Sequence, residues 1–117
     1  MNSILTSIKK MLGITEEYEH FDGDLIIHIN SVLAILTQLG VGPKEGFKII
    51  DKNDRWSDFI QDTNKLENVK SYVYLKVKLI FDPPQSSIVI EATNKLISEL
   101  EWRMNVAGEE NNNQITE

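Results

Sequence analysis

Two adjacent prolines divide the most apolar part of this chain into two segments. Pro83 and Pro84 lie between an apolar run at 69–81 and a second one at 88–104. Proline has no amide hydrogen to donate and disfavours helical geometry in the residue before it, so no regular element can continue through this point. The sequence therefore predicts two separate elements joined by a hinge that begins at Asp82.

The segment after the prolines has the pattern of an amphipathic helix. Ser86 or Ser87 can cap its N-terminus, and Gly108 is placed to end it. Its apolar residues recur at helical spacing: Ile88, Val89, Ala92, Leu96, Ile97, Leu100 and Met104. Trp102 lies close to this wide apolar face, which favours a core position for the indole over an interface position.

The segment before the prolines fits two kinds of secondary structure. Between Tyr72 and Phe81, apolar and β-branched residues alternate with Lys and Tyr, which favours a strand. Helical spacing fits as well, through Leu66, Val69, Val73, Val77 and Ile80. Because a central helix can be apolar on most sides, periodicity alone leaves both structures open.

Two helices are predicted in the first third of the chain. A short one follows Ser3, a candidate N-cap, and ends at Gly13, a candidate C-cap. A longer one follows Asp22, also a candidate N-cap, and ends at Gly40. Acidic residues cluster just before this second helix, where they favour the positive end of its dipole.

A long loop is predicted after Gly40. Glycines and a proline interrupt the range 41–55, and within it Phe47–Ile50 has an extended pattern that allows a short strand. Trp56 and Phe59 then predict a brief helical turn. For Trp56, a core position and a subunit contact are equally favoured.

Length and composition indicate one domain, at 1–105, with a polar tail at 106–117. The apolar fraction of 41% and the charged fraction of 26% are those of a globular chain. The net charge of −6 opposes tight binding to a phosphate backbone. Without cysteine, disulfides and thiolate metal sites are excluded. No run is long enough to span a membrane, so we expect a soluble protein made in the cytoplasm.

No catalytic residue, cofactor or metal site is predicted. The best metal candidates are His20, Asp22, Asp24 and His28, but acids at a helix N-terminus are ordinary capping residues and the spacing matches no known ligand motif. The range 51–54 resembles the start of a calcium loop, yet Arg and Trp follow where a ligand and a glycine are needed.

The densest basic stretch is interleaved with aromatic residues, as in some proteins that bind single-stranded nucleic acids. It comprises Lys65, Lys70, Tyr72, Tyr74, Lys76 and Lys78. Lysines on an apolar element also serve to solvate its exposed edge. Given the acidic balance of the chain, we favour this second interpretation.

Three segments together resemble a known family. They are WSDFI at 56–60, VKSYVYLKVKLIFDPP at 69–84 and ELEWRMN at 99–105. In order and spacing they are similar to the small head-tail connector proteins of long-tailed phages, also called head-completion or DNA-packaging adaptors. The resemblance implies a mostly helical subunit in which 72–81 is a helix. We therefore expect an all-α bundle of four to five helices with a long loop between the second and third.

The resemblance also implies a function without a reaction. Such proteins assemble into a ring, of about twelve copies, under the portal protein. They extend the DNA channel without sequence-specific binding and offer a docking place to the next neck, stopper or tail protein, so the expected location is the head-tail junction of the virion. The alternative is a non-enzymatic helical module that binds and regulates a partner protein.

We expect subunit or partner contacts at six residues: Phe47, Ile49, Trp56, Phe59, Arg103 and Asn105. The tail at 106–117 is expected to become ordered on the portal. The loop at 41–55 is expected to face a neighbouring subunit or the channel.

Overall fold

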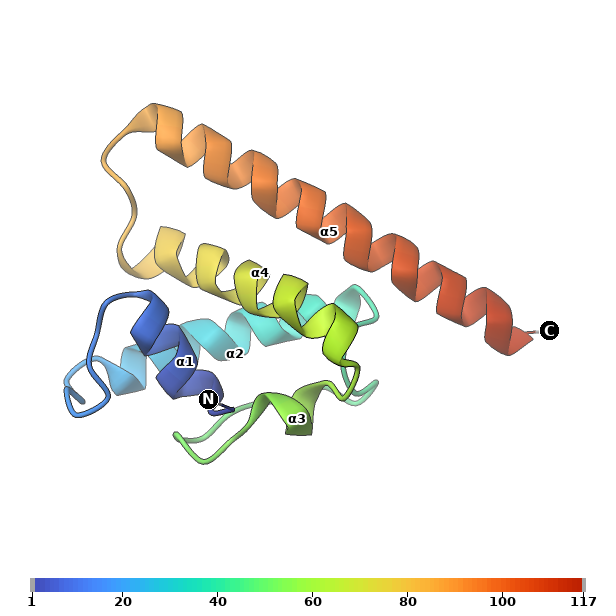
Figure 1. The fold of residues 1–117 in the computed structure, drawn as a ribbon, viewed down its shortest axis with the longest axis horizontal. Coiled ribbons are helices and arrows are strands. Elements are labelled where there is room, and N and C mark those ends of the chain that lie inside the picture. Colours follow the sequence, from blue (N-terminus) through green and yellow to red (C-terminus); the bar gives the residue numbers. More distant parts are fainter. Residues whose placement is uncertain (1, 117) are drawn as a thin grey trace.

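Five helices follow one another along residues 2–116, and the fourth lies at their centre (Figure 1). The computed structural model describes residues 2–116, with side chains described through Asn105. The helices are α1 (Ile4–Met11), α2 (Asp22–Gln38), α3 (Trp56–Phe59), α4 (Thr63–Phe81) and α5 (Ser87–Thr116). No strand occurs within residues 2–116. The predicted all-α bundle with a long loop between the second and third helices is confirmed.

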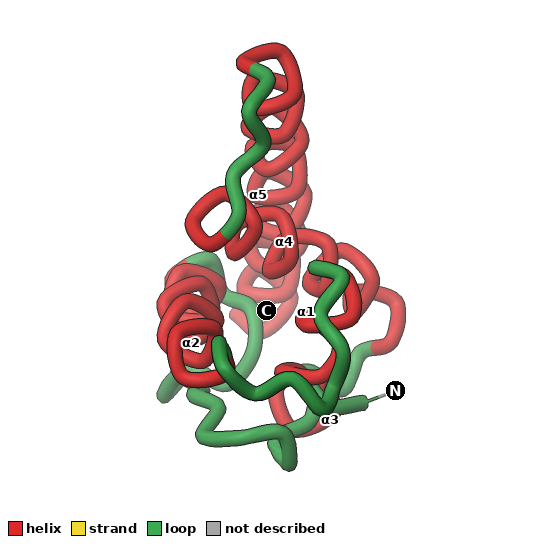
Figure 2. The backbone as a smooth tube through the Cα atoms, turned by 90° about the vertical axis from the view of Figure 1, so that its left-hand side faces the viewer, coloured by secondary structure: helices red, strands yellow, loops and turns green. Residues whose placement is uncertain are grey.

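Helix α4 contacts three other helices, α1, α2 and α5. In Figure 2, α5 lies above α4, while α1 and α2 lie below it on either side. Val69, Val73 and Val77 of α4 are fully buried, at spacings of four residues. The alternating pattern at 72–81 was misleading, because this segment is a helix. A helix covered on several sides is apolar nearly all round, and apolar and polar residues in its sequence can then alternate by chance.

Helix α2 supplies five buried side chains to the core: Leu25, Ile29, Val32, Leu33 and Leu36. It ends as predicted, since Gly40 follows with a φ of 84°. Its start differs from the prediction. Phe21 holds the N-cap position, no side chain caps the helix, and Asp22 is the first helical residue. The Asp22 carboxylate lies against Lys9 of α1, so the ion pair replaces the expected cap.

Helix α1 is joined by backbone hydrogen bonds to the segment just before α3. The Ile4 amide donates to the Asp54 carbonyl at 3.1 Å, and the Trp56 amide donates to the Asn2 carbonyl at 2.8 Å. Ser3 caps α1 as predicted, because its hydroxyl accepts from the Thr6 amide at 3.2 Å. The N-terminus is therefore fixed to a part of the chain that is distant in sequence.

The loop between α2 and α3 is held by one side chain of α2. The Asn30 amide nitrogen donates to the Ile49 carbonyl at 3.0 Å, and the Asn30 amide oxygen accepts from the Ile49 amide at 2.7 Å. These two bonds satisfy the groups that a partner strand would otherwise satisfy. The segment at 47–50 is thus extended without being a strand.

The prolines separate α4 from α5 as predicted. Helix α4 ends at Phe81, and the Ser86 hydroxyl accepts from the Val89 amide at 3.4 Å at the start of α5. The prediction that Gly108 ends this helix was wrong, since α5 continues to Thr116. Glycine costs a helix about 1 kcal/mol but does not force it to stop. The side chains of 106–117 lie outside the described residues, and the division into a domain at 1–105 and a flexible tail stays a prediction.

Candidate interaction surfaces

Two of the four residues considered for a metal site make other contacts. Asp22 pairs with Lys9, and the His20 ring packs edge-on against Phe21 with centroids 4.8 Å apart. In the part of the chain that the structure describes, no group of three or more His, Cys, Asp or Glu side chains is placed to hold a metal ion. The acidic turn at 51–54 closes on itself, because the Asp54 carboxylate accepts from the amides of Ile50 and Asp51.

The four lysines of α4 have different surroundings and form no common stripe. Lys70 lies over the indole of Trp56, with 6.0 Å from its Nζ to the ring centroid. Lys78 pairs with Asp82 at 3.2 Å. All four lysines are partly buried, which agrees with lysine stems covering an apolar helix.

The six residues predicted to make contacts divide into three groups by burial. Ile49, Trp56 and Phe59 are buried inside the subunit, and Trp56 has no accessible surface. A buried side chain reaches a neighbour only after local rearrangement, so these three first serve the core. Phe47 is partly buried and packs on Phe59, with ring centroids 5.5 Å apart. Arg103 and Asn105 are exposed on α5 and remain available for contact.

Helix α5 also carries large apolar residues that are exposed or only partly covered. Its buried residues are Ile97, Leu100 and Met104, which face the core. Four other large residues on the helix are exposed: Ile88 at 77%, Val89 at 47%, Leu96 at 42% and Trp102 at 69%. We call these four residues the outer face of α5.

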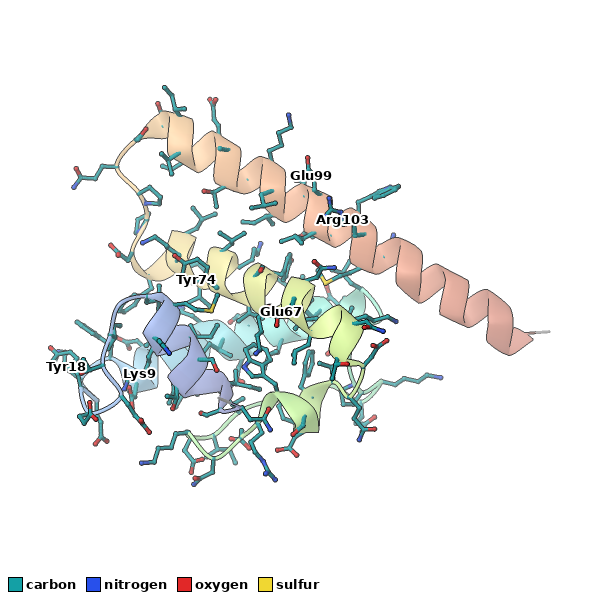
Figure 3. All side chains as sticks on the ribbon, in the orientation of Figure 1. Lys9, Tyr18, Glu67, Tyr74, Glu99 and Arg103 are labelled. Carbon is teal, nitrogen blue, oxygen red and sulfur yellow. The ribbon has the colours of Figure 1, made fainter. Side chains whose placement is uncertain are left out.

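Trp102 was wrongly favoured as a core residue. At 100° per residue, it lies about 200° from the buried Met104 around the helix, so both cannot face α4. It lies instead in an open depression with Lys95, Ser98, Glu99 and Arg103. Glu99 and Arg103 are labelled along α5 in Figure 3.

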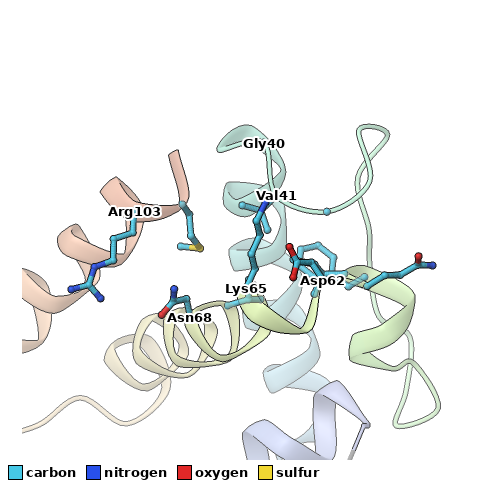
Figure 4. A pocket seen from close by; sticks show the side chains of 12 residues that line it. Gly40, Val41, Asp62, Lys65, Asn68 and Arg103 are labelled. Carbon is cyan, nitrogen blue, oxygen red and sulfur yellow. The ribbon is translucent and has the colours of Figure 1, made fainter. Parts of the chain in front are cut away.

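A cavity of about 380 Å³ lies where α5 approaches the start of α4. Figure 4 shows it with Asp62, Lys65 and Asn68 on one side and Arg103 on the other. Its apolar lining comes from Val41, Phe59, Ile60, Val69 and Met104. We call it the α4–α5 cavity.

Glycine shapes one wall of this cavity. Gly42 has a φ of 84°, and a Cβ at this position would lie 2.5 Å from Cε1 of Phe59. Any other residue here would need both a strained backbone and a displaced Phe59 ring. The close approach of the loop to α3 therefore depends on glycine.

One polar contact joins α4 to α5 beside the core. The Tyr72 hydroxyl donates to Oε2 of Glu101 at 2.6 Å, and the Tyr72 side chain is otherwise buried. Burial, followed by the hydrogen bond to Glu101 and the negative charge of that carboxylate, raises the pKa of Tyr72 far above its ordinary value. This hydrogen bond holds α5 against α4 at Tyr72 and Glu101.

We expect Tyr72→Phe to lower the free energy of unfolding by about 1–2 kcal/mol at pH 7, because Glu101 loses its donor. The raised pKa means that the folded state keeps the Tyr72 proton after the unfolded chain has lost it. The wild type should therefore lose stability as pH rises above about 10, by up to about 1.4 kcal/mol per pH unit. Urea unfolding between pH 8 and 11 should show a steeper loss for the wild type than for the variant. Parallel slopes would contradict this linkage.

Three structural contacts were not predicted from the sequence: Lys9 with Asp22, Asn30 with Ile49, and Tyr72 with Glu101. Of these contacts, only that of Lys9 could have been suspected from the sequence. Lys9 lies four residues after Leu5, on the apolar side of α1, and this position indicates a buried lysine that needs a partner. The other two contacts join residues that only the tertiary structure brings together.

Comparison with known proteins gives a family for the chain. A family model described as phage connector protein matches residues 4–111, which is most of the sequence. No curated protein and no solved structure gives a significant match. None of the helices within residues 2–116 is both long and apolar enough to cross a membrane. The chain belongs to the phage connector protein family.

Proposed function

We propose that the protein is a ring-forming connector that docks under the portal of a phage head, extends the DNA channel and links the head to the tail machinery after packaging. Family membership supports a structural role in the virion. One observation carries the finer proposal. Helix α5 packs mainly on α4, and its outer face has four large apolar residues that the subunit itself covers only in part.

A ring needs surface of this kind. Each subunit in a closed ring contacts two neighbours through two different patches, and both patches are exposed in the isolated subunit. Rows of apolar residues on the surface of a small protein are typical of such interfaces. The net charge of −6 suits a channel through which DNA slides without adhering, since like charges repel at short range.

The first test is the assembly state. We expect light scattering after size-exclusion chromatography to show a ring, of about twelve copies, either alone or once portal protein is added. Portal protein with an affinity tag should also retain the connector. If the chain stayed monomeric at high concentration and failed to bind portal rings, the proposed function would be wrong.

We further propose that the segment at 106–117 contacts the portal and that the loop at 41–55 faces a neighbour or the channel. The first assignment is supported by the length of α5, which extends well past α4 (Figure 1). Deleting residues 106–117 should abolish capture by portal protein. Met104 is the last buried residue among those whose side chains the structure describes, and we expect the melting temperature to change little. Unchanged capture by the deletion variant would exclude this role of the segment.

A further inference from the structure

We propose that Trp102 of one subunit inserts into the α4–α5 cavity of a second copy of this chain. The inference rests on the proposed ring and deepens it, because it names the contact that joins neighbours. It requires that the projecting side chain and the cavity match in size and chemistry. It also requires that Trp102 cannot reach the cavity of its own subunit.

Trp102 is well suited to anchor an interface. Its side chain is 69% exposed, although tryptophan is one of the most apolar residues and is seldom left in water. Arg103 lies next to it, and Trp and Arg are the residue types most enriched at interface hot spots. Lys95 and Glu99 flank the indole on the outer face and provide a polar rim of both charges.

The α4–α5 cavity has the chemistry to receive an indole. Its volume of about 380 Å³ is near the lower end for small-molecule pockets, so one aromatic side chain fits. Phe59, Ile60 and Met104 supply apolar contact for the ring. Its polar groups also match, since an indole N–H needs an acceptor and the Asp62 carboxylate supplies one. The Lys65 ammonium can lie over the ring face as a cation–π partner.

The two features lie on different sides of α5. Met104 lines the cavity, whereas Trp102 points about 200° away around the same helix. One subunit therefore cannot insert its own Trp102 into its own cavity. When one such contact joins two copies, one Trp102 and one cavity of the pair remain free. A contact of this heterologous type repeats from subunit to subunit, and it forms a ring when the rotation between neighbours closes.

The absence of cysteine from the chain permits a direct test by cross-linking. We would prepare Glu99→Cys, beside Trp102, and Gln61→Cys, at the cavity, because both variants keep the indole and Lys65. Each variant is treated alone, and then their mixture is treated, with a short bismaleimide. Only the mixture should give a covalent dimer, because each variant carries only one of the two positions that meet between subunits. Glu99→Cys that cross-links with itself would overturn the proposal, since it would mean that the outer faces pair with each other.

A second test uses variants that each lack one half of the contact. Trp102→Ala removes the projecting indole, and Asn68→Trp fills the cavity. Each variant alone should assemble roughly thirtyfold more weakly than the wild type, as for a hot-spot residue. Mixed together they should form heterodimers and no rings, because one intact contact remains. Ile27→Ala, a comparably exposed apolar change on α2 and outside the outer face, is the matched control and should still form rings.

Fluorescence gives a readout that does not depend on cross-linking. In a Trp56→Phe background, Trp102 is the remaining tryptophan, and its emission should shift to shorter wavelength as subunits assemble. Circular dichroism of every variant confirms that it folds. Rings that form normally from Trp102→Ala would overturn this contact and leave the connector function standing. Wild-type chains that form no ring even with portal protein would overturn both.

Discussion

Replacing Trp56 with alanine is expected to destabilise the subunit by about 3–5 kcal/mol, the usual cost of removing a buried tryptophan. The side chain has no accessible surface. Its indole nitrogen donates to the Ser7 hydroxyl at 3.2 Å, and Lys70 covers the ring. The substitution therefore removes contacts to both α1 and α4. Urea unfolding followed by circular dichroism measures the loss.

The second tryptophan of the chain is the matched control. Trp102→Ala changes the same residue type on the surface of α5 and should alter the free energy of unfolding of the subunit by no more than about 0.5 kcal/mol. Similar losses for the two variants would mean that Trp56 is not the core residue that the structure shows.

Replacing Lys9 with methionine is expected to cost about 2–3 kcal/mol. Only 2% of the Lys9 side chain is exposed, and its Nζ lies 2.8 Å from Oδ1 of Asp22. Oδ1 accepts no well-directed hydrogen bond, so this contact is an ion pair. The same Nζ donates to the Glu16 carbonyl at 3.0 Å. Methionine keeps the apolar stem but leaves a partly buried carboxylate without its cation, which costs more than the pair itself contributes.

Lys10 provides the control for this change. It is the next residue of α1 and is exposed, so Lys10→Met should alter stability by less than about 0.5 kcal/mol. The double variant Lys9→Met with Asp22→Asn should regain part of the lost free energy of unfolding, because it no longer carries the unpaired Asp22 carboxylate. Thermal and urea unfolding of the four proteins tests both statements. A double variant that is no more stable than Lys9→Met would contradict the ion-pair explanation.

Local signals in the sequence were enough to place most helix ends. Ser3 capped α1, Gly40 ended α2 and the prolines separated α4 from α5, because each acts through the backbone of its immediate neighbours. Gly108 failed as a helix end since glycine only permits the left-handed turn that stops a helix. Whether a helix stops at a glycine also depends on the tertiary contacts of the residues beyond it.

Burial was harder to predict than helicity. Helix α5 has apolar residues on two faces, and nothing in its own sequence says which face α4 covers. Trp102 was therefore assigned to the core, although Ile97, Leu100 and Met104 occupy that side. The same limit explains the strand pattern of α4, whose neighbours come from both ends of the chain.

The attachment of the N-terminus has a consequence for how the chain folds during synthesis. The amide of Ile4 finds its acceptor on Asp54, and the carbonyl of Asn2 accepts from Trp56. Helix α1 has only eight residues, too few to be stable alone in water. Helix α1 leaves the ribosome before the segment it binds, and it is therefore among the last parts of the bundle to fold. Helix α1 can pack in its final position only after the segment before α3 has been synthesised.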